Sequence, residues 1–175
     1  MYRKIEYLKA VLENHLTYLE TGDLAKRADL SGADLSGMDL SHVDLSYADL
    51  SGTNLRGTDL YAAKLNSALL NDTDLSHAML SFADLSFVNL SHADLSFVNL
   101  IHADLSHADL SGVDLSHADL TRATLTGANL SGAQIDDTLL DRTNLLHANL
   151  SGVDLSHVYL IDTDLNCAEG LNGKK

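Results

Sequence analysis

A leucine occurs at every fifth position from Leu30 to Leu165, and the one exception, Ile135, is also aliphatic. The neighbouring residues repeat as well, because the segment Ala-Asp-Leu-Ser-Gly begins at Ala28 and again at Ala33. Leucines five residues apart share no face of an α-helix, where each residue advances ~100°. In a flat strand they alternate between the two faces, since five is an odd step against a period of two. The chain must therefore turn once per repeat, so that every leucine returns to the same interior.

The residues within each repeat predict its local geometry. We call the aliphatic fifth residue the centre. The residue two before the centre is small, as in Ala28 and Val43, and an extended stretch points both residues inward. The Asp or Asn between them then points outward, and the Asp, Asn, Ser and Gly around the centre are typical turn formers. Such a unit cannot bury its leucine alone, which predicts a solenoid with coils stacked ~4.8 Å apart.

These repeats resemble the pentapeptide-repeat family, whose consensus is A(D/N)LXX, over residues 28–167. The resemblance implies an all-β fold in which four repeats make one coil of a right-handed, quadrilateral β-helix. Twenty-eight repeats then give about seven coils, or a rod ~34 Å long. We expect an N-terminal capping helix and linker at 1–27, the solenoid at 28–167 and a C-terminal tail at 168–175. The stretch from Leu12 to Gly32 also looks like the N-terminal region of many bacterial members.

The N-terminal segment has apolar residues at helical spacing, which predicts an amphipathic helix over about residues 2–20, ending near Gly22. Its apolar stripe consists of Ile5, Leu8, Leu12, Leu16 and Leu19, with Val11 and His15 alongside. We expect this stripe to cover the open leucine core at the first coil. The C-terminus has no comparable cover, so that end is expected to be a bare edge.

The charge of the chain is strongly negative, at −14. The solenoid alone holds twenty Asp against Arg56, Lys64, Arg122 and Arg142, which gives −16. A surface this acidic repels nucleic acid and anionic lipid, which argues against direct binding to DNA or to a membrane. The single cysteine, Cys167, excludes a disulfide framework and fits a reducing cytosol. Because there is also no signal-peptide pattern, we expect a cytoplasmic protein.

Departures from the repeat gather on one side of the predicted rod. If four repeats close a coil, residues twenty apart lie above one another. The side with centres Leu40, Leu60 and so on to Leu160 carries more outward apolar residues than the others: Tyr61, Met79, Phe82, Ile101, Leu139, Tyr159 and Ile161. We call this side the apolar face. Contiguous exposed apolar surface commonly marks an interface, and the competing interpretation is tolerated substitution on a stable rod.

The side with centres Leu35 to Leu155 is the most acidic. It carries one column of carboxylates in equivalent outward places: Asp34, Asp74, Asp94, Asp114 and Asp154. We call it the acidic column. The favoured interpretation is a solvated face whose Asp side chains cap turns.

Eight of the nine histidines share one slot, two residues after the centre. The slot also accepts Gly and Phe, which indicates an outward, permissive position. Phe82, Phe87 and Phe97 each precede a histidine by twenty residues, which predicts three stacked Phe–His pairs. These repeats also create triad-like Asp, Ser and His spacings, but a convex rod offers no cleft for a triad.

The sequence indicates no catalytic, metal or cofactor site. The best candidate ligand pair, His147 and Cys167, has too few ligands for structural zinc. We therefore expect no enzyme activity, no metal and no cofactor.

The sequence favours a non-enzymatic, acidic, rod-shaped binding or scaffold protein that acts through protein–protein contacts. Both the apolar face and the uncapped C-terminal end offer places for a homodimer, and a foreign protein partner is equally open. The family resemblance implies an alternative, because some members mimic duplex DNA and inhibit or protect DNA gyrase or topoisomerase. Those members commonly place Phe at many centres, dimerise through a C-terminal helix and in some cases carry loops between coils. This chain has no Phe centre, a short tail and an unbroken repeat from 28 to 167.

Overall fold

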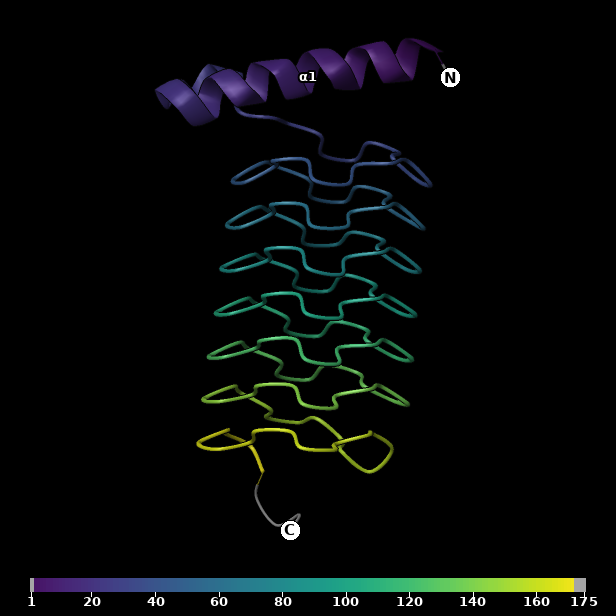
Figure 1. Ribbon diagram of the computed structural model, residues 1–175, viewed down its shortest axis with the longest axis vertical. Coiled ribbons are helices and arrows are strands. Elements are labelled where there is room, and N and C mark those ends of the chain that lie inside the picture. The colour runs from purple at the N-terminus through teal and green to yellow at the C-terminus, as the bar shows by residue number, and fades with distance from the viewer. Residues whose placement is uncertain (1, 172–175) are drawn as a thin grey trace.

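The computed structural model describes residues 2–171, with side chains from Glu6 onward. Helix α1, Tyr2–Thr21, lies across one end of a stack of coils. A short 3-10 helix, η1, spans Leu24–Lys26 and leads into the first coil. The stack continues to the far end of the molecule, where the described C-terminal residues lie (Figure 1).

Each coil contains twenty residues, because parallel backbone bridges join residue n to residue n + 20. The first bridge pairs Asp29 with Asp49, and the last pairs Asn149 with Glu169. Within residues 2–171 the bridges are isolated, so each side of the square holds one bridge rather than a longer strand. The fold is the right-handed quadrilateral β-helix with an N-terminal helix that the sequence predicted.

Backbone hydrogen bonds between coils fix the register. In the repeat centred on Leu90, the N–H of Leu90 donates to the carbonyl of Asp109 in the next coil over 2.8 Å. The N–H of Asp109 donates back to Val88 over 2.9 Å. The backbone polar groups are therefore paired while the side chains of Leu90 and Val88 point into a dry interior.

The interior is a column of centre side chains. Every centre from Leu30 to Leu150, including Ile135, is at most 5 % exposed. The small residues two before the centres fill the rest, and most are also buried. Buried threonines in these places donate their hydroxyls to backbone carbonyls: Thr58 Oγ1, for example, donates to the carbonyl of Leu35 in the preceding coil over 3.0 Å.

The corners are tight turns with left-handed backbone at their third residue. The N–H of Ala93 donates to the carbonyl of Leu90 over 3.0 Å, which closes a four-residue turn. The third residue of that turn, His92, has φ +60°, as type II turns require. The slot that holds most histidines is outward and accepts many residue types, as the sequence predicted, although its left-handed backbone favours glycine.

Helix α1 covers the first coil with one face. Leu8 is buried in the core, and Val11 and Leu12 pack against it. His15 is fully buried, and its Nδ1 accepts a hydrogen bond from the N–H of Ala28 over 3.0 Å. The helix is therefore a cap that is joined to the first repeat by a buried polar contact.

Two members of the predicted stripe need comment. Leu16 was expected to face the core but is 54 % exposed. The buried face instead passes through Val11 and His15, one residue back along the helix, which rotates Leu16 toward solvent. The prediction for Ile5 lies outside the described side chains.

The C-terminal end of the solenoid is looser than the rest. Leu155, Leu160 and Leu165 are only partly buried. No bridge joins Gln134 to Asp154 in the described coils, and Asp137 donates to the carbonyl of His157 instead of to that of Ser156. The repeat is unbroken in sequence, but its backbone register slips on one side of the last coil, while the bridges on the other three sides are kept.

The buried His15 predicts a pH-dependent stability. Burial lowers the pKa of His15, against smaller opposing contributions from the backbone of Ser46 and the carboxylate of Asp44, while Arg27 adds to the lowering. Below about pH 6.5 the unfolded chain binds the proton more readily, so the free energy of unfolding falls as the pH falls. We expect acid to destabilise the wild type more than His15→Gln, which keeps an acceptor but does not titrate. Denaturant midpoints at pH 7.5 and pH 5 measure this, and parallel losses in both proteins would contradict it.

Candidate protein-interaction face

The outward side chains are positioned by the turns, and the acidic column takes part in them. Each of its five carboxylates accepts a hydrogen bond from the backbone N–H two residues later, over 2.9–3.2 Å. The acceptors are Asp34, Asp74, Asp94, Asp114 and Asp154. These Asx interactions satisfy a turn N–H that would otherwise need water. The acidic column therefore has a structural role that accounts for its repetition.

The same interaction holds a carboxylate ionised on the apolar face. Asp39 accepts hydrogen bonds from the backbone and the hydroxyl of Ser41, and these lower the pKa of Asp39. Asp39 consequently remains charged well below neutral pH.

Four aromatic rings form a ladder along the N-terminal half of the apolar face. Tyr61 contacts His42 edge-on, with ring centroids 5.5 Å apart, and contacts Phe82 at 5.7 Å. Phe82 in turn stacks on His102 at 4.9 Å with an interplanar angle of 17°. Tyr61 and Phe82 are 42 % and 52 % exposed. The ladder thus presents a ridge of aromatic surface to solvent.

All three predicted Phe–His stacks are confirmed. Besides Phe82 with His102, Phe87 stacks on His107 at 5.0 Å and Phe97 on His117 at 4.7 Å. The structure adds His77 above Phe97 at 4.9 Å. The sequence analysis missed that pair because it looked for histidine only in the coil after each Phe.

The other predicted members of the face lie on the same side of the rod, as the bridges between coils require. Met79 is 47 % exposed and follows the aromatic ridge. Ile101 and Leu139 are half-buried. Tyr159 and Ile161, on the last coil, are 54 % and 63 % exposed.

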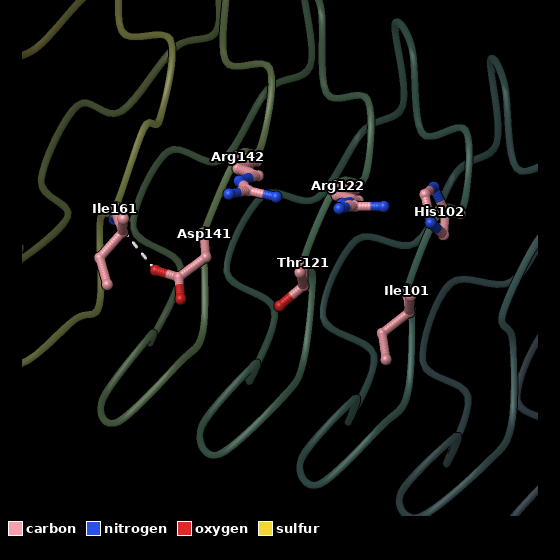
Figure 2. A pocket seen from close by; sticks show the side chains of 7 residues that line it. All are labelled: Ile101, His102, Thr121, Arg122, Asp141, Arg142 and Ile161. Carbon is pink, nitrogen blue, oxygen red and sulfur yellow. Dashed lines mark hydrogen bonds between the residues drawn. The ribbon is translucent and has the colours of Figure 1, made fainter.

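A shallow, open hollow of about 450 Å³ lies on the apolar face between Ile101 and Ile161. Its lining, shown in Figure 2, is Ile101, His102, Thr121, Arg122, Asp141, Arg142 and Ile161. Arg122 and Arg142 occupy the same slot on successive coils, so their guanidinium groups lie side by side (Figure 2). A convex rod was expected to have no cleft, so this hollow is a difference from the sequence analysis.

The hollow contains both basic and acidic side chains, and Ile101 and Ile161 lie at its two ends. Arg142 Nε lies 3.5 Å from Asp162 Oδ2 at its lower end. Asp141 Oδ1 accepts a hydrogen bond from the N–H of Ile161 over 2.9 Å. In most repeats this N–H bonds to an Asp or Asn two residues earlier, but here that residue is Tyr159, whose side chain cannot replace the carboxylate. Sequence reasoning counted both arginines only as charge, although their spacing of twenty residues already placed them together.

The described residues contain no cluster of three or more His, Cys, Asp or Glu side chains placed to hold a metal ion. Cys167 is exposed. No helix within residues 2–171 has the length and apolar character needed to cross a bilayer. The geometry of the hollow offers charged and apolar contacts rather than a nucleophile with an adjacent base.

This geometry defines a repeat protein with an aromatic ridge and a charged hollow on one side of a rod. The sequence profile of pentapeptide repeats matches residues 26–60, 58–96, 89–127 and 128–166. The chain therefore belongs to the pentapeptide-repeat family. No curated protein sequence matches it significantly.

Solved structures of pentapeptide-repeat proteins are similar to this chain. HetL from the cyanobacterium Nostoc sp. strain PCC 7120, involved in the regulation of heterocyst differentiation, is 30 % identical, with 84 % of this chain and 91 % of HetL covered and a TM-score of 0.31. The protein alr5209 from Nostoc PCC 7120 is 35 % identical over 53 % of this chain and 78 % of its own, with a TM-score of 0.46. QnrB1, a plasmid-mediated fluoroquinolone resistance protein, is 22 % identical over 79 % of this chain and 77 % of its own, with a TM-score of 0.49.

The Phe82–His102 stack predicts a measurable coupling energy. Both residues have left-handed backbone, so Gly at either position removes the ring and also relieves strain. In a double-mutant cycle with Phe82→Gly and His102→Gly the strain relief cancels, and we expect a coupling of about 0.5–1.5 kcal/mol from the stack. A control cycle with Phe82→Gly and His117→Gly, which lie on different sides, should give a coupling near zero. Equal couplings in the two cycles, from denaturant unfolding, would show that the rings do not interact.

Proposed function

We propose that this protein is a non-enzymatic binding or scaffold protein whose apolar face makes protein–protein contacts. The observation that supports this most is the ridge of Tyr61 and Phe82 beside a charged hollow on one side of the rod. Large aromatic side chains and arginine are the residue types that contribute most at protein interfaces. The members of the face are Tyr61, Met79, Phe82, Ile101, Leu139, Tyr159 and Ile161, together with Arg122 and Arg142.

The rigid backbone supports this role. Since every coil is hydrogen-bonded to its neighbours, the face is already ordered before a partner arrives. A preorganised surface loses little conformational entropy on binding. Contacts spread over several coils can therefore add to a specific interaction without a deep pocket.

A photo-crosslinking experiment tests the proposal. A benzoyl-phenylalanine replaces Tyr61 on the apolar face or, as the control, Leu69 on the opposite side at a similar level of the rod. Both positions are exposed, at 42 % and 37 %. We expect irradiation in extract of the source cells to give discrete protein adducts from position 61 and none from position 69. Equal labelling from both positions, or no protein adduct at all, would count against an interaction face.

A second candidate, a DNA-mimicking inhibitor or protector of gyrase or topoisomerase, draws support from the regular carboxylates of the acidic column. Their hydrogen bonds to turn N–H groups explain the same regularity without a partner. We therefore expect a supercoiling assay with purified gyrase to show neither inhibition nor protection from a quinolone at a large excess of this protein. A dose-dependent effect that is weakened by Asp94→Asn and Asp114→Asn together would favour the second candidate instead.

A further inference from the structure

The apolar face carries a ridge and a hollow at matched distances from Ile101. Tyr61 lies two coils before Ile101, and Asp141, in the hollow, lies two coils after it. Phe82 lies one coil before His102, and Arg122 lies one coil after it. Because residues in one slot are stacked every twenty positions, each ring has a counterpart in the hollow at the same lateral position on the face.

We propose that the apolar face binds the same face of a second copy of this chain, with the two rods antiparallel about a two-fold axis at the level of Ile101. This inference rests on the proposed function and names its partner. This axis lies between the two faces and perpendicular to the rods. It reverses the order of the coils, but a residue in a given slot of one copy still lies opposite a residue in the same slot of the other. The ridge of each copy then enters the hollow of the other, and the two contacts are identical, as in any two-fold dimer.

The chemistry of the opposed residues is complementary. Phe82 faces Arg122, whose long side chain offers both an apolar stem and a charged group to an aromatic ring. The phenol of Tyr61 faces the carboxylate of Asp141 as a hydrogen-bond donor faces an acceptor. On the axis itself, Ile101 meets Ile101 of the second copy.

Charges at the ends of the face also pair. Arg142 faces the repeat centred on Leu60, where Asp59 is the outward carboxylate. Asp162, which already lies 3.5 Å from Arg142, faces the slot of His42. A parallel dimer lacks these pairs. It places Arg122 and Arg142 of one copy at the same height along the rod as those of the other copy, so that the two hollows face each other. The antiparallel arrangement is therefore the favoured one.

The size of the face indicates a weak, reversible dimer. The seven coils span ~34 Å, and one side of the square is about 10 Å wide, since each side contains roughly three extended residues. Such an area falls below that of a standard stable interface. Two rods of charge −14 also repel each other. We expect a dissociation constant in the micromolar range, or weaker, that tightens as added salt screens this repulsion.

Cysteine cross-linking tests the axis directly. In a Cys167→Ser background, Ile101→Cys places two thiols on the axis, and mild oxidation should give a disulfide-linked dimer of twice the 18.8 kDa chain mass. The matched control, Thr121→Cys, places its two thiols one coil on either side of the axis, or about 10 Å apart along the rod, which is beyond disulfide reach. The Ser81→Cys, Thr121→Cys double variant brings unlike positions opposite each other and should cross-link again.

The association is tested by mass in solution over a range of protein concentrations. Sedimentation of the wild type should show a dimer that Arg122→Glu weakens at least tenfold. Arg56→Glu makes the same change in charge on the neighbouring acidic side and should leave the dimer unchanged or slightly weaker. Circular dichroism melts of all variants check that the solenoid remains folded.

Three results would overturn the inference: a wild type that stays monomeric at several hundred micromolar, cross-linking of Thr121→Cys as fast as that of Ile101→Cys, or a dimer unaffected by Arg122→Glu. A monomer that still gives adducts to another protein from position 61 refutes the dimer and leaves the proposed function standing. A monomer without any protein adduct refutes both.

Discussion

The structure depends on the register of twenty residues between adjacent coils. Two interactions enforce it together. Aliphatic centres such as Leu90 are fully buried, and the backbone of each repeat hydrogen-bonds to the repeats above and below it. A slip of one residue would turn polar Asp into the interior and Leu out to solvent, so the hydrophobic effect and the hydrogen bonds select the same alignment. Among the described coils, only the side of the last coil at Asp137 and His157 departs from it.

This register makes the surface readable from the sequence to an unusual degree. The periodic leucine showed that the chain turns once per repeat, and the family resemblance supplied the four repeats per coil. Together they predicted the stacking of Phe82 on His102 and of Phe97 on His117. The amphipathic pattern likewise placed the capping helix. What the pattern could not supply was the rotation of that helix, which exposes Leu16, because its buried face is set by the fit of His15 against Ala28.

The candidate site was predicted only in part for a similar reason. Apolar residues stand out in an acidic repeat, so Tyr61 and Phe82 were found from their type alone. Arg122 and Arg142 are polar residues in an outward slot, and they become a site only through the hollow between Ile101 and Ile161. That hollow depends on how far each side chain projects from the rod, and a one-dimensional pattern does not carry that information.

The acidity of the rod has a local explanation that bears on function. Fifteen of the twenty Asp residues in the solenoid accept the N–H two residues later in their own turn. A carboxylate suits that place because it accepts the turn hydrogen bond and keeps the rod soluble by mutual repulsion. Negative charge at these positions is thus a consequence of the repeat and says little about a partner. Five Asp residues lie outside this pattern, namely Asp72, Asp136, Asp137, Asp141 and Asp162, and the last two stand beside Arg142 on the apolar face. Two of the five carboxylates that the turns do not require therefore lie where the aromatic ridge and the hollow already indicate a contact surface.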